Sequence, residues 1–230
     1  MKKNKLIEFD VSLANEYKNY CLIGIDEVGR GSLAGPVIAC AFTWKKETNK
    51  INKKSDKKLL LEIDDSKKLT KEAREEIYKF LIRFGEFALG YASVLEIEKL
   101  NILNATFLAM KRAYENLLLN LSRENLKTFL LIDGNKFNPF INSKQVSIID
   151  GDAKSALIAS ASIIAKVYRD LLMEKISKSE TYNKFDWLTN SGYGTLSHRN
   201  AIKKHGITPL HRKLFVRKTL SSINQITVKD

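Results

Sequence analysis

Four acidic side chains in this sequence could together hold divalent cations: Asp26, Glu27, Asp133 and Asp152. If these carboxylates converge, they repel one another strongly unless cations neutralise them. Oxygen ligands favour Mg²⁺ or Mn²⁺ over Zn²⁺. A site for two such ions indicates phosphodiester hydrolysis. One ion would lower the pKa of the attacking water, and the other, about 4 Å away, would stabilise the leaving oxygen.

Two of these acids stand at the ends of predicted strands. Residues 21–25 form a short, apolar, β-branched run that ends at Asp26, and residues 127–132 form a similar run that ends at Asp133. Neighbouring parallel strands in α/β folds form a ligand crevice at their carboxyl ends. Asp133 would therefore lie beside Asp26 if the two strands are adjacent and parallel. Turn chemistry alone would also explain Asp133, because Gly and Asn follow it.

Asp152 lies between a predicted strand, residues 145–149, and a predicted helix, residues 153–176. An acid at this place is typical of a helix cap or a first helical turn. Capping would explain Asp152 completely, so a functional role for it depends on the other three acids.

A glycine-rich turn follows the first strand, in the stretch GIDEVGRGSLAGP. With a second strand predicted at residues 37–42, the turn would form the tip of a hairpin that carries Asp26, Glu27 and Arg30. Gly29 and Gly31 let the backbone leave strand geometry and let N–H groups approach a phosphate or a sugar. The alternative is a surface turn with solvated charges.

Ser66 and Lys67 stand just ahead of a predicted helix, residues 71–83, with Thr70 as its N-cap. A helix N-terminus is suited to binding a phosphate. Ordinary surface lysines before a capped helix explain the same residues equally well.

The composition points to a polyanionic partner. The chain has 230 residues, and 39 Lys and Arg against 26 Asp and Glu give a net charge of +13. Nucleic acid is the commonest partner of such a protein. No apolar run is long enough to span a membrane, and nothing directs export, so we expect a cytoplasmic protein without a membrane partner. Cys21 and Cys40 fit buried thiols in a reducing compartment.

The rest of the sequence predicts further strands and helices and a second basic stretch near the C-terminus. A strand is predicted at residues 84–94, a short helix at 95–100 and a long core helix at 101–121. The helix-like stretch 196–204 is basic and could contact a phosphate backbone, although a solvated basic face would look the same. The three histidines, His198, His205 and His211, have no common metal-binding spacing, and surface histidines on helices are ordinary.

Several motifs resemble those of the ribonuclease HII family, in the family's order and over nearly the whole chain: GIDEVGRGSLAGP, DDSKKL, EKLNILNATFLAMKRA, LLIDGN, GDAKSALIASASIIAKVYRD, GYGTLSH and TPLHRKLF. The resemblance is to the bacterial type. It implies an α/β fold, a ribonuclease-H-like five-stranded mixed sheet flanked by helices, with a helical C-terminal region. We expect a catalytic domain at residues 1–178 and the C-terminal helical region at 179–230, in a monomeric protein.

The resemblance also implies the reaction and the site. Asp26, Glu27, Asp133 and Asp152 would bind two Mg²⁺ or Mn²⁺ ions as catalytic acids, and Gly29-Arg30-Gly31 would grip the 2′-hydroxyl of the ribonucleotide, the group that separates RNA from DNA. Tyr193 would stack on the sugar of the following deoxynucleotide. Because they lie ahead of a predicted helix N-terminus, Ser66 and Lys67 are also expected to contact substrate. The family cleaves RNA–DNA hybrids and duplex DNA with embedded ribonucleotides, 5′ of the ribonucleotide, leaving 3′-hydroxyl and 5′-phosphate ends.

Two residues depart from the family's pattern. Asp150 stands where bacterial relatives commonly carry Lys, and Leu214 replaces a hydroxyl residue.

Two other function classes remain open. A non-catalytic nucleic-acid-binding protein would explain the charge but would not need four acids. A resolvase or integrase would use a similar acid cluster but has no reason to carry the Gly-Arg-Gly turn and Tyr193.

Overall fold

A computed structural model describes residues 4–45, 51–121 and 126–226 of the chain, with side chains up to residue 221. The chain forms two compact units. The sheet unit comprises the residues up to Val28, Ile38–Tyr91 and Phe107–Val167, and the C-terminal unit comprises Gly29–Val37, Ala92–Thr106 and the residues from Tyr168 onward. The units interleave along the chain, whereas the predicted domains divide it once, at residue 178. That single division stays a prediction.

Five strands form one mixed sheet: β1 (Cys21–Val28), β2 (Val37–Trp44), β3 (Gly85–Ala92), β4 (Thr128–Asp133) and β5 (Lys144–Ile148). Their order is β3-β2-β1-β4-β5. β1 runs antiparallel to β2 and parallel to β4, and β4 runs parallel to β5. The predicted five-stranded mixed sheet is therefore confirmed.

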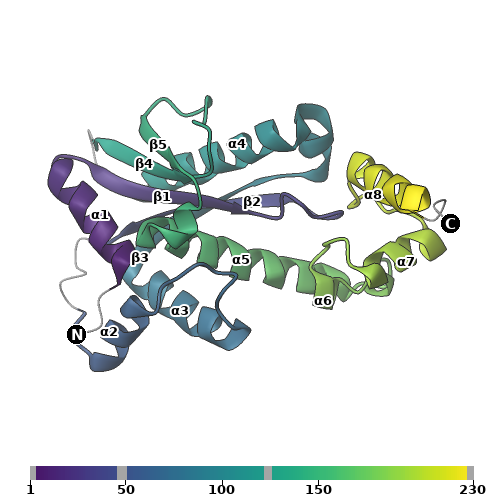
Figure 1. Cartoon of the computed structure of the whole chain (residues 1–230), viewed down its shortest axis with the longest axis horizontal. Coiled ribbons are helices and arrows are strands. Elements are labelled where there is room, and N and C mark those ends of the chain that lie inside the picture. The colour runs from purple at the N-terminus through teal and green to yellow at the C-terminus, as the bar shows by residue number, and fades with distance from the viewer. Residues whose placement is uncertain (1–3, 46–50, 122–125, 227–230) are drawn as a thin grey trace. The chain divides into compact units, whose positions relative to one another are not determined.

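The described helices are α1 (Lys5–Glu16), α2 (Lys54–Leu61), α3 (Lys71–Phe84), α4 (Val94–Leu121), α5 (Ala156–Ser177), α6 (Trp187–Asn190), α7 (Leu196–His205) and α8 (Lys213–Ile226), with 3₁₀ segments η2 (Gly151–Ala153) and η3 (Asn183–Phe185) (Figure 1). Within the sheet unit, helices flank the sheet as the fold class requires. Within the described ranges, no helix is long and apolar enough to cross a membrane.

Local sequence signals explain where helices begin and break. The hydroxyl of Thr70 accepts a hydrogen bond from the Ala73 N–H at 3.2 Å and caps α3 as predicted. Asn101 interrupts α4 with φ at +66° and ψ at 166°, a strained conformation outside the left-handed helical region. Its side-chain oxygen then accepts from the N–H groups of Leu103 and Asn104 and starts the second half of the helix.

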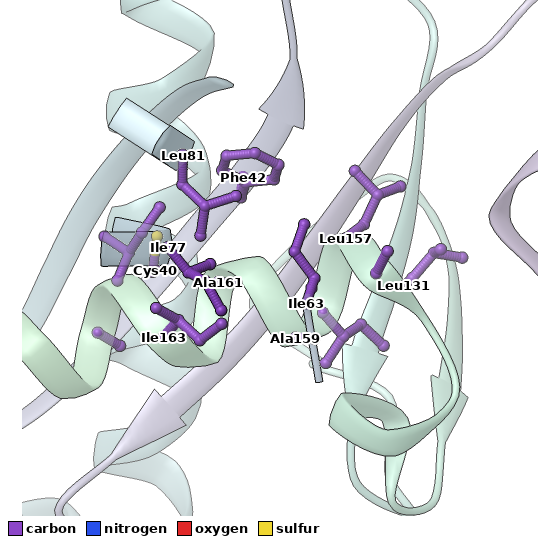
Figure 2. Close-up of a cluster of buried hydrophobic side chains, with 14 of the residues drawn as sticks. Cys40, Phe42, Ile63, Ile77, Leu81, Leu131, Leu157, Ala159, Ala161 and Ile163 are labelled. Atoms are coloured by element: carbon purple, nitrogen blue, oxygen red, sulfur yellow. The ribbon is translucent and has the colours of Figure 1, made fainter. Parts of the chain in front are cut away.

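The main core of the sheet unit lies between the sheet and helices α1, α3 and α5. It contains side chains from β1, β2 and β4 together with α3 and α5, and Figure 2 shows many of them converging around Ala161 and Ile63. Figure 1 shows the part of α4 that belongs to the sheet unit, from Phe107 onward, on the other side of the sheet. Gly24 of β1 allows the close approach of α5, because a Cβ at Gly24 would overlap the backbone at Leu157.

Candidate active site

Asp26 and Asp133 lie at the same edge of the sheet, as the sequence predicted. Ile25 pairs with Ile132 across the parallel strands β1 and β4, so Asp26 and Asp133 follow next to each other. The acids of β1 do not stand at the tip of a hairpin, however. Asp26 lies opposite Cys40 within regular strand geometry, because β2 provides pairing partners for β1 as far as Val28.

Asp26 is the most deeply buried of the four acids, with 4% of its surface exposed. Burial raises its pKa well above the ordinary value, and the charges of Glu27 and Asp133 raise it further. A hydrogen bond from Ser162 and one from the Glu27 N–H, at 2.7 Å, favour the charged form. Burial and neighbouring negative charges disfavour the charged form of this carboxylate. A bound cation would stabilise that charged form.

Asp133 and Asp152 are linked through the backbone of η2. The N–H of Gly151 donates to the Asp133 carboxylate at 2.7 Å. The pKa of Asp133 is raised, chiefly by burial and then by the charges of Asp152 and Asp150. Electrostatic effects therefore link Asp26 to Glu27 and to Asp133, and Asp133 to Asp152, while the convergence of all four acids stays a prediction.

Asp152 does not cap α5, so that alternative explanation for it is wrong. The hydroxyl of Ser155 accepts from the N–H of Ile158 at 3.2 Å, and the carboxylate of Asp10 accepts from the N–H of Leu157 at 2.8 Å. Asp152 lies earlier, in η2, where its side chain is 6% exposed. Sequence reasoning missed Asp10, because it lies in a weakly patterned N-terminal segment.

Lys67 provides a positive charge to the acid cluster. Its ammonium nitrogen lies 3.0 Å from a carboxylate oxygen of Asp152 and 4.0 Å from one of Asp65. Burial lowers the pKa of Lys67, but the acids, Asp152 foremost, outweigh burial and raise it overall. The side chain remains 79% exposed, so it stays accessible from solvent.

Ser66, the other residue predicted ahead of α3, is buried. Its hydroxyl lies 3.0 Å from the hydroxyl of Ser162, which in turn donates to Asp26. Its predicted contact with substrate stays a prediction. Ser162 was missed, because a serine in an alanine-rich helix gives no signal of a polar role.

The chemistry of these side chains fits a hard divalent cation. Among the described residues, no group of three or more His, Cys, Asp or Glu side chains is already arranged to hold a metal ion. The donor set consists of carboxylate oxygens, the ligands that Mg²⁺ and Mn²⁺ prefer. A cation would also relieve the repulsion that raises the pKa of Asp26 and of Asp133. Asp26, Glu27, Asp133 and Asp152 are the residues that would hold it.

The glycine-rich loop, residues 29–36, belongs to the C-terminal unit, where two buried arginines fix its backbone. Arg212 donates to the carbonyl of Arg30 at 2.9 Å and twice to that of Gly35, at 3.0 and 2.8 Å. Burial lowers the pKa of Arg212 to about 9, with a further contribution from Arg169. The guanidinium is thus still charged at neutral pH.

Arg169 holds the same loop from α5. It donates to the Ser32 hydroxyl at 2.9 Å, the Ala34 carbonyl at 3.1 Å and the Ser191 carbonyl at 2.8 Å. Its guanidinium lies 5.3 Å from the ring centre of Tyr193, over the ring face. Sequence reasoning missed this arginine, although its helical spacing from buried Ala165 and Met173 was a signal.

The fold and the acid cluster together define an enzyme of the ribonuclease-H-like class, with carboxylates on adjacent parallel strands at the centre of a mixed sheet. The family model "Ribonuclease HII" matches residues 23–219. The chain belongs to the ribonuclease HII family, whose members are metal-dependent endonucleases and hydrolases.

Curated relatives agree with this assignment. The chain is 50% identical over 194 residues to ribonuclease HII of Pelagibacter ubique, covering 84% of this chain and 95% of the relative. It is 46% identical over 215 residues to ribonuclease HII of Fusobacterium nucleatum, covering 92% of each chain.

Solved structures share the fold at low sequence identity. The ribonuclease HII of Archaeoglobus fulgidus, solved in a complex with PCNA, has a TM-score of 0.63 at 24% identity, covering 84% of this chain and 93% of that one. Bst-RNase HIII in complex with Mn²⁺ has a TM-score of 0.69 at 18% identity, covering 90% of this chain and 71% of that one. These likenesses show the fold alone.

Proposed function

We propose that the protein hydrolyses RNA–DNA hybrids and nicks duplex DNA at single embedded ribonucleotides. Cleavage falls on the 5′ side of the ribonucleotide and leaves a 3′-hydroxyl and a 5′-phosphate. The observation that carries this proposal is the carboxylate cluster, in which Asp26 and Asp133 lie next to each other on adjacent parallel strands and Gly151 links Asp133 to Asp152. The basic chain, with a net charge of +13, suits the polyanionic substrate.

The four acids bind two Mg²⁺ or Mn²⁺ ions in this proposal. The ions supply an acidified water and charge stabilisation at the leaving oxygen. The acids orient these ions, and burial of Asp26 excludes water that would weaken their attraction to the carboxylates. Lys67 is free to turn from Asp152 toward a substrate phosphate, because most of its side chain is exposed. Ser66 keeps Ser162 in place beneath this contact.

Recognition of the ribose is assigned to the loop that begins at Gly29. Gly29, Arg30 and Gly31 present backbone groups to the 2′-hydroxyl, which can both donate and accept hydrogen bonds. The bond from Arg212 to the Arg30 carbonyl supports this role, since it fixes the peptide that would meet the ribose. Tyr193 stacks on the sugar of the next deoxynucleotide, and only Val28 separates Gly29 from Glu27 in the sequence.

In the cell, such an enzyme would act as a cytoplasmic monomer. It would remove ribonucleotides during DNA replication and repair, because its product is a nick with a 3′-hydroxyl end that other enzymes can extend.

The test is a nicking assay on a 5′-labelled DNA duplex with one central ribonucleotide, in Mg²⁺ or Mn²⁺. We expect one cut, 5′ of the ribonucleotide, and no cut in the all-DNA duplex. Asp133→Asn should lower cleavage by about 10³-fold or more, since it removes a charged ligand, and should still bind the duplex. Glu75→Gln, which removes an exposed charge from α3, is the matched control.

The outcomes separate the three classes. A wild-type protein that binds the duplex without cutting it would be a non-catalytic binder. Cutting of the all-DNA duplex would indicate a resolvase-like nuclease. Full activity in Asp133→Asn would remove the carboxylate cluster from the mechanism.

A further inference from the structure

Two histidines of the C-terminal unit lie in its core, not on a helix surface. His198 is 0% exposed and His211 is 1% exposed. They pack against Trp187 and Phe185, which are also fully buried, with ring centres 4.7 to 6.1 Å apart. The expectation of surface histidines is thus wrong for these two.

The polar partners of His198 fix which of its nitrogens carries the proton. The indole N–H of Trp187 can only donate, and it lies 2.9 Å from Nε2 of His198. Nε2 must therefore accept, which leaves the proton on Nδ1. Nδ1 lies 2.9 Å from the carbonyl oxygen of Tyr193, which can only accept. The ring therefore bridges a donor and an acceptor as a neutral Nδ1–H tautomer.

The partners of His211 fix the opposite tautomer. The backbone N–H of Thr208 donates to Nδ1 of His211 at 2.9 Å, so Nδ1 carries no proton. The proton is then on Nε2, which lies 3.1 Å from Nε2 of His198 and donates to it, so that His211 and Trp187 share the one lone pair of that nitrogen. Bonds run in one direction, from Thr208 through His211 and His198 to the carbonyl of Tyr193. The donor from Trp187 also occupies the nitrogen of His198 that a metal would need.

The series ends at the carbonyl of Tyr193, which directly follows two residues with positive φ angles. Ser191 has φ at +45° and Gly192 has φ at +79°, directly before Tyr193. The Tyr193 carbonyl also accepts from the N–H of Thr195 at 2.8 Å. With Arg169 over its ring, Tyr193 is held at both its backbone and its side chain.

We propose that His198 and His211 are positioning residues for Tyr193, acting as neutral rings of fixed and opposite tautomer. The inference rests on the proposed function, in which Tyr193 contacts the sugar beside the ribonucleotide. A proton added to either ring would turn an acceptor into a donor that faces another donor, and the series would break at that ring.

The environment keeps both rings neutral near pH 7. Burial lowers the pKa of His211 to about 4, with a further contribution from His198. Burial also lowers the pKa of His198, against the hydrogen bond to Tyr193 and the charge of Asp186. The other titratable groups that the described residues place against this aromatic core are His205 and Lys184, both at the ring of Phe185, and Tyr182, which stacks on Trp187.

Imidazole ¹⁵N NMR of the wild-type protein at pH 7 tests the tautomers directly. We expect a neutral ring protonated at Nδ1 for His198 and a neutral ring protonated at Nε2 for His211. Either ring charged at pH 7, or His198 protonated at Nε2, would overturn the inference. This measurement needs no variant, so it decides even if a substitution prevents folding.

Two variants of His198 distinguish a hydrogen bond that positions Tyr193 from packing of the imidazole ring alone. In His198→Asn the amide NH₂ can replace Nδ1 and still donate to Tyr193. In His198→Gln the amide oxygen can replace Nε2 and accept from Trp187, but the donor to Tyr193 is lost. On the single-ribonucleotide duplex we expect the Gln variant to raise KM about tenfold with kcat little changed, and the Asn variant to remain near wild type. Equal effects of the two variants, or none, would overturn the inference.

Tyr193→Ala separates this inference from the proposed function. A raised KM in Tyr193→Ala, together with an unchanged KM in His198→Gln, would overturn the positioning role alone. An unchanged KM in Tyr193→Ala would overturn the proposed role of Tyr193, and the inference with it.

Discussion

Gly29 and Gly31 both lack a side chain, but the structure gives a reason only for the first. Gly29 has φ at +90°, and a Cβ there would overlap the side chain of Arg169. At Gly31 φ is not positive and nothing lies within 4 Å of the place a Cβ would take. Neither its backbone conformation nor its neighbours therefore require glycine at this position, whereas in the proposed function the substrate would need the space.

Alanine at the two positions should thus have different effects. Gly29→Ala should lower the free energy of unfolding by about 1–3 kcal/mol, from the strained φ and the contact with Arg169. Gly31→Ala should leave stability within about 0.5 kcal/mol of wild type and still lower cleavage at a single ribonucleotide at least about tenfold. Urea denaturation and the nicking assay measure the two effects. Full activity in Gly31→Ala would contradict the contact between this loop and the ribose.

Asp150 is an exposed acid in the left-handed conformation, with φ at +52°, and its charge raises the pKa of Asp133. Asn accepts this conformation. Asp150→Asn removes the charge, so the pKa of Asp133 should fall. Asp133 must be ionised to bind a cation, so the acid limb of the pH–rate profile should move to lower pH by a few tenths of a unit.

Glu75→Gln again serves as the control for this pH profile. Glu75 is exposed on α3 and is not among the groups that shift the pKa of Asp133. A profile for Asp150→Asn that coincides with that of Glu75→Gln would contradict the electrostatic effect of Asp150.

At the scale of elements, one carboxylate joins α1 to the start of α5. Asp10 of α1 accepts from the Ser155 hydroxyl at 2.7 Å and from the Leu157 N–H at 2.8 Å. It thereby satisfies a donor that the N-terminus of α5 would otherwise leave buried without a partner. Because η2 with Asp152 directly precedes α5, this bond also supports one side of the acid cluster.

The pH dependence of stability should reveal Asp10. Burial raises its pKa from 3.8 to about 6, so the folded state holds the proton more tightly than the unfolded state. The resulting stability is fully present below pH 3.8 and is lost as pH rises through about 6. Relative to Asp10→Asn, which cannot ionise, the wild-type free energy of unfolding should fall by up to about 3 kcal/mol between pH 4 and 7.

Urea denaturation at several pH values measures this difference. Ser12→Ala, on the exposed face of the same helix, should show no such trend against wild type. A difference between wild type and Asp10→Asn that is constant, or that grows with pH, would contradict the buried carboxylate.

At the scale of the whole molecule, the net charge of +13 governs association with nucleic acid. Each phosphate that Lys or Arg neutralises releases condensed counterions. Affinity of the metal-free protein for duplex DNA should therefore fall about 10- to 1000-fold between 50 and 200 mM salt. Fluorescence anisotropy with a labelled duplex measures it. Affinity that does not change with salt would show that the charge is not used for binding.

Much of the fold followed from local patterns. The strand at 21–25, the cap at Thr70 and the helix break near Asn101 depend on residues near in sequence, and the structure has each of them. The extent of β1 did not follow, because the pairing of Glu27 with Ala39 is set by the partner strand. The acid cluster was predicted from apolar runs that end in Asp, since strand ends are visible locally.

The sequence by itself determined the family, the five-stranded sheet and the acids that follow its apolar runs, because each is encoded in a continuous motif or a periodic run. Only the tertiary structure decided that Asp10 supports α5, that Arg169 and Arg212 hold the glycine-rich loop, and that His198 and His211 meet in a core. In each of these pairs the partners lie 13 to 182 positions apart. Burial and hydrogen-bond partners between distant residues leave no periodic trace, so they appear only when the chain is folded.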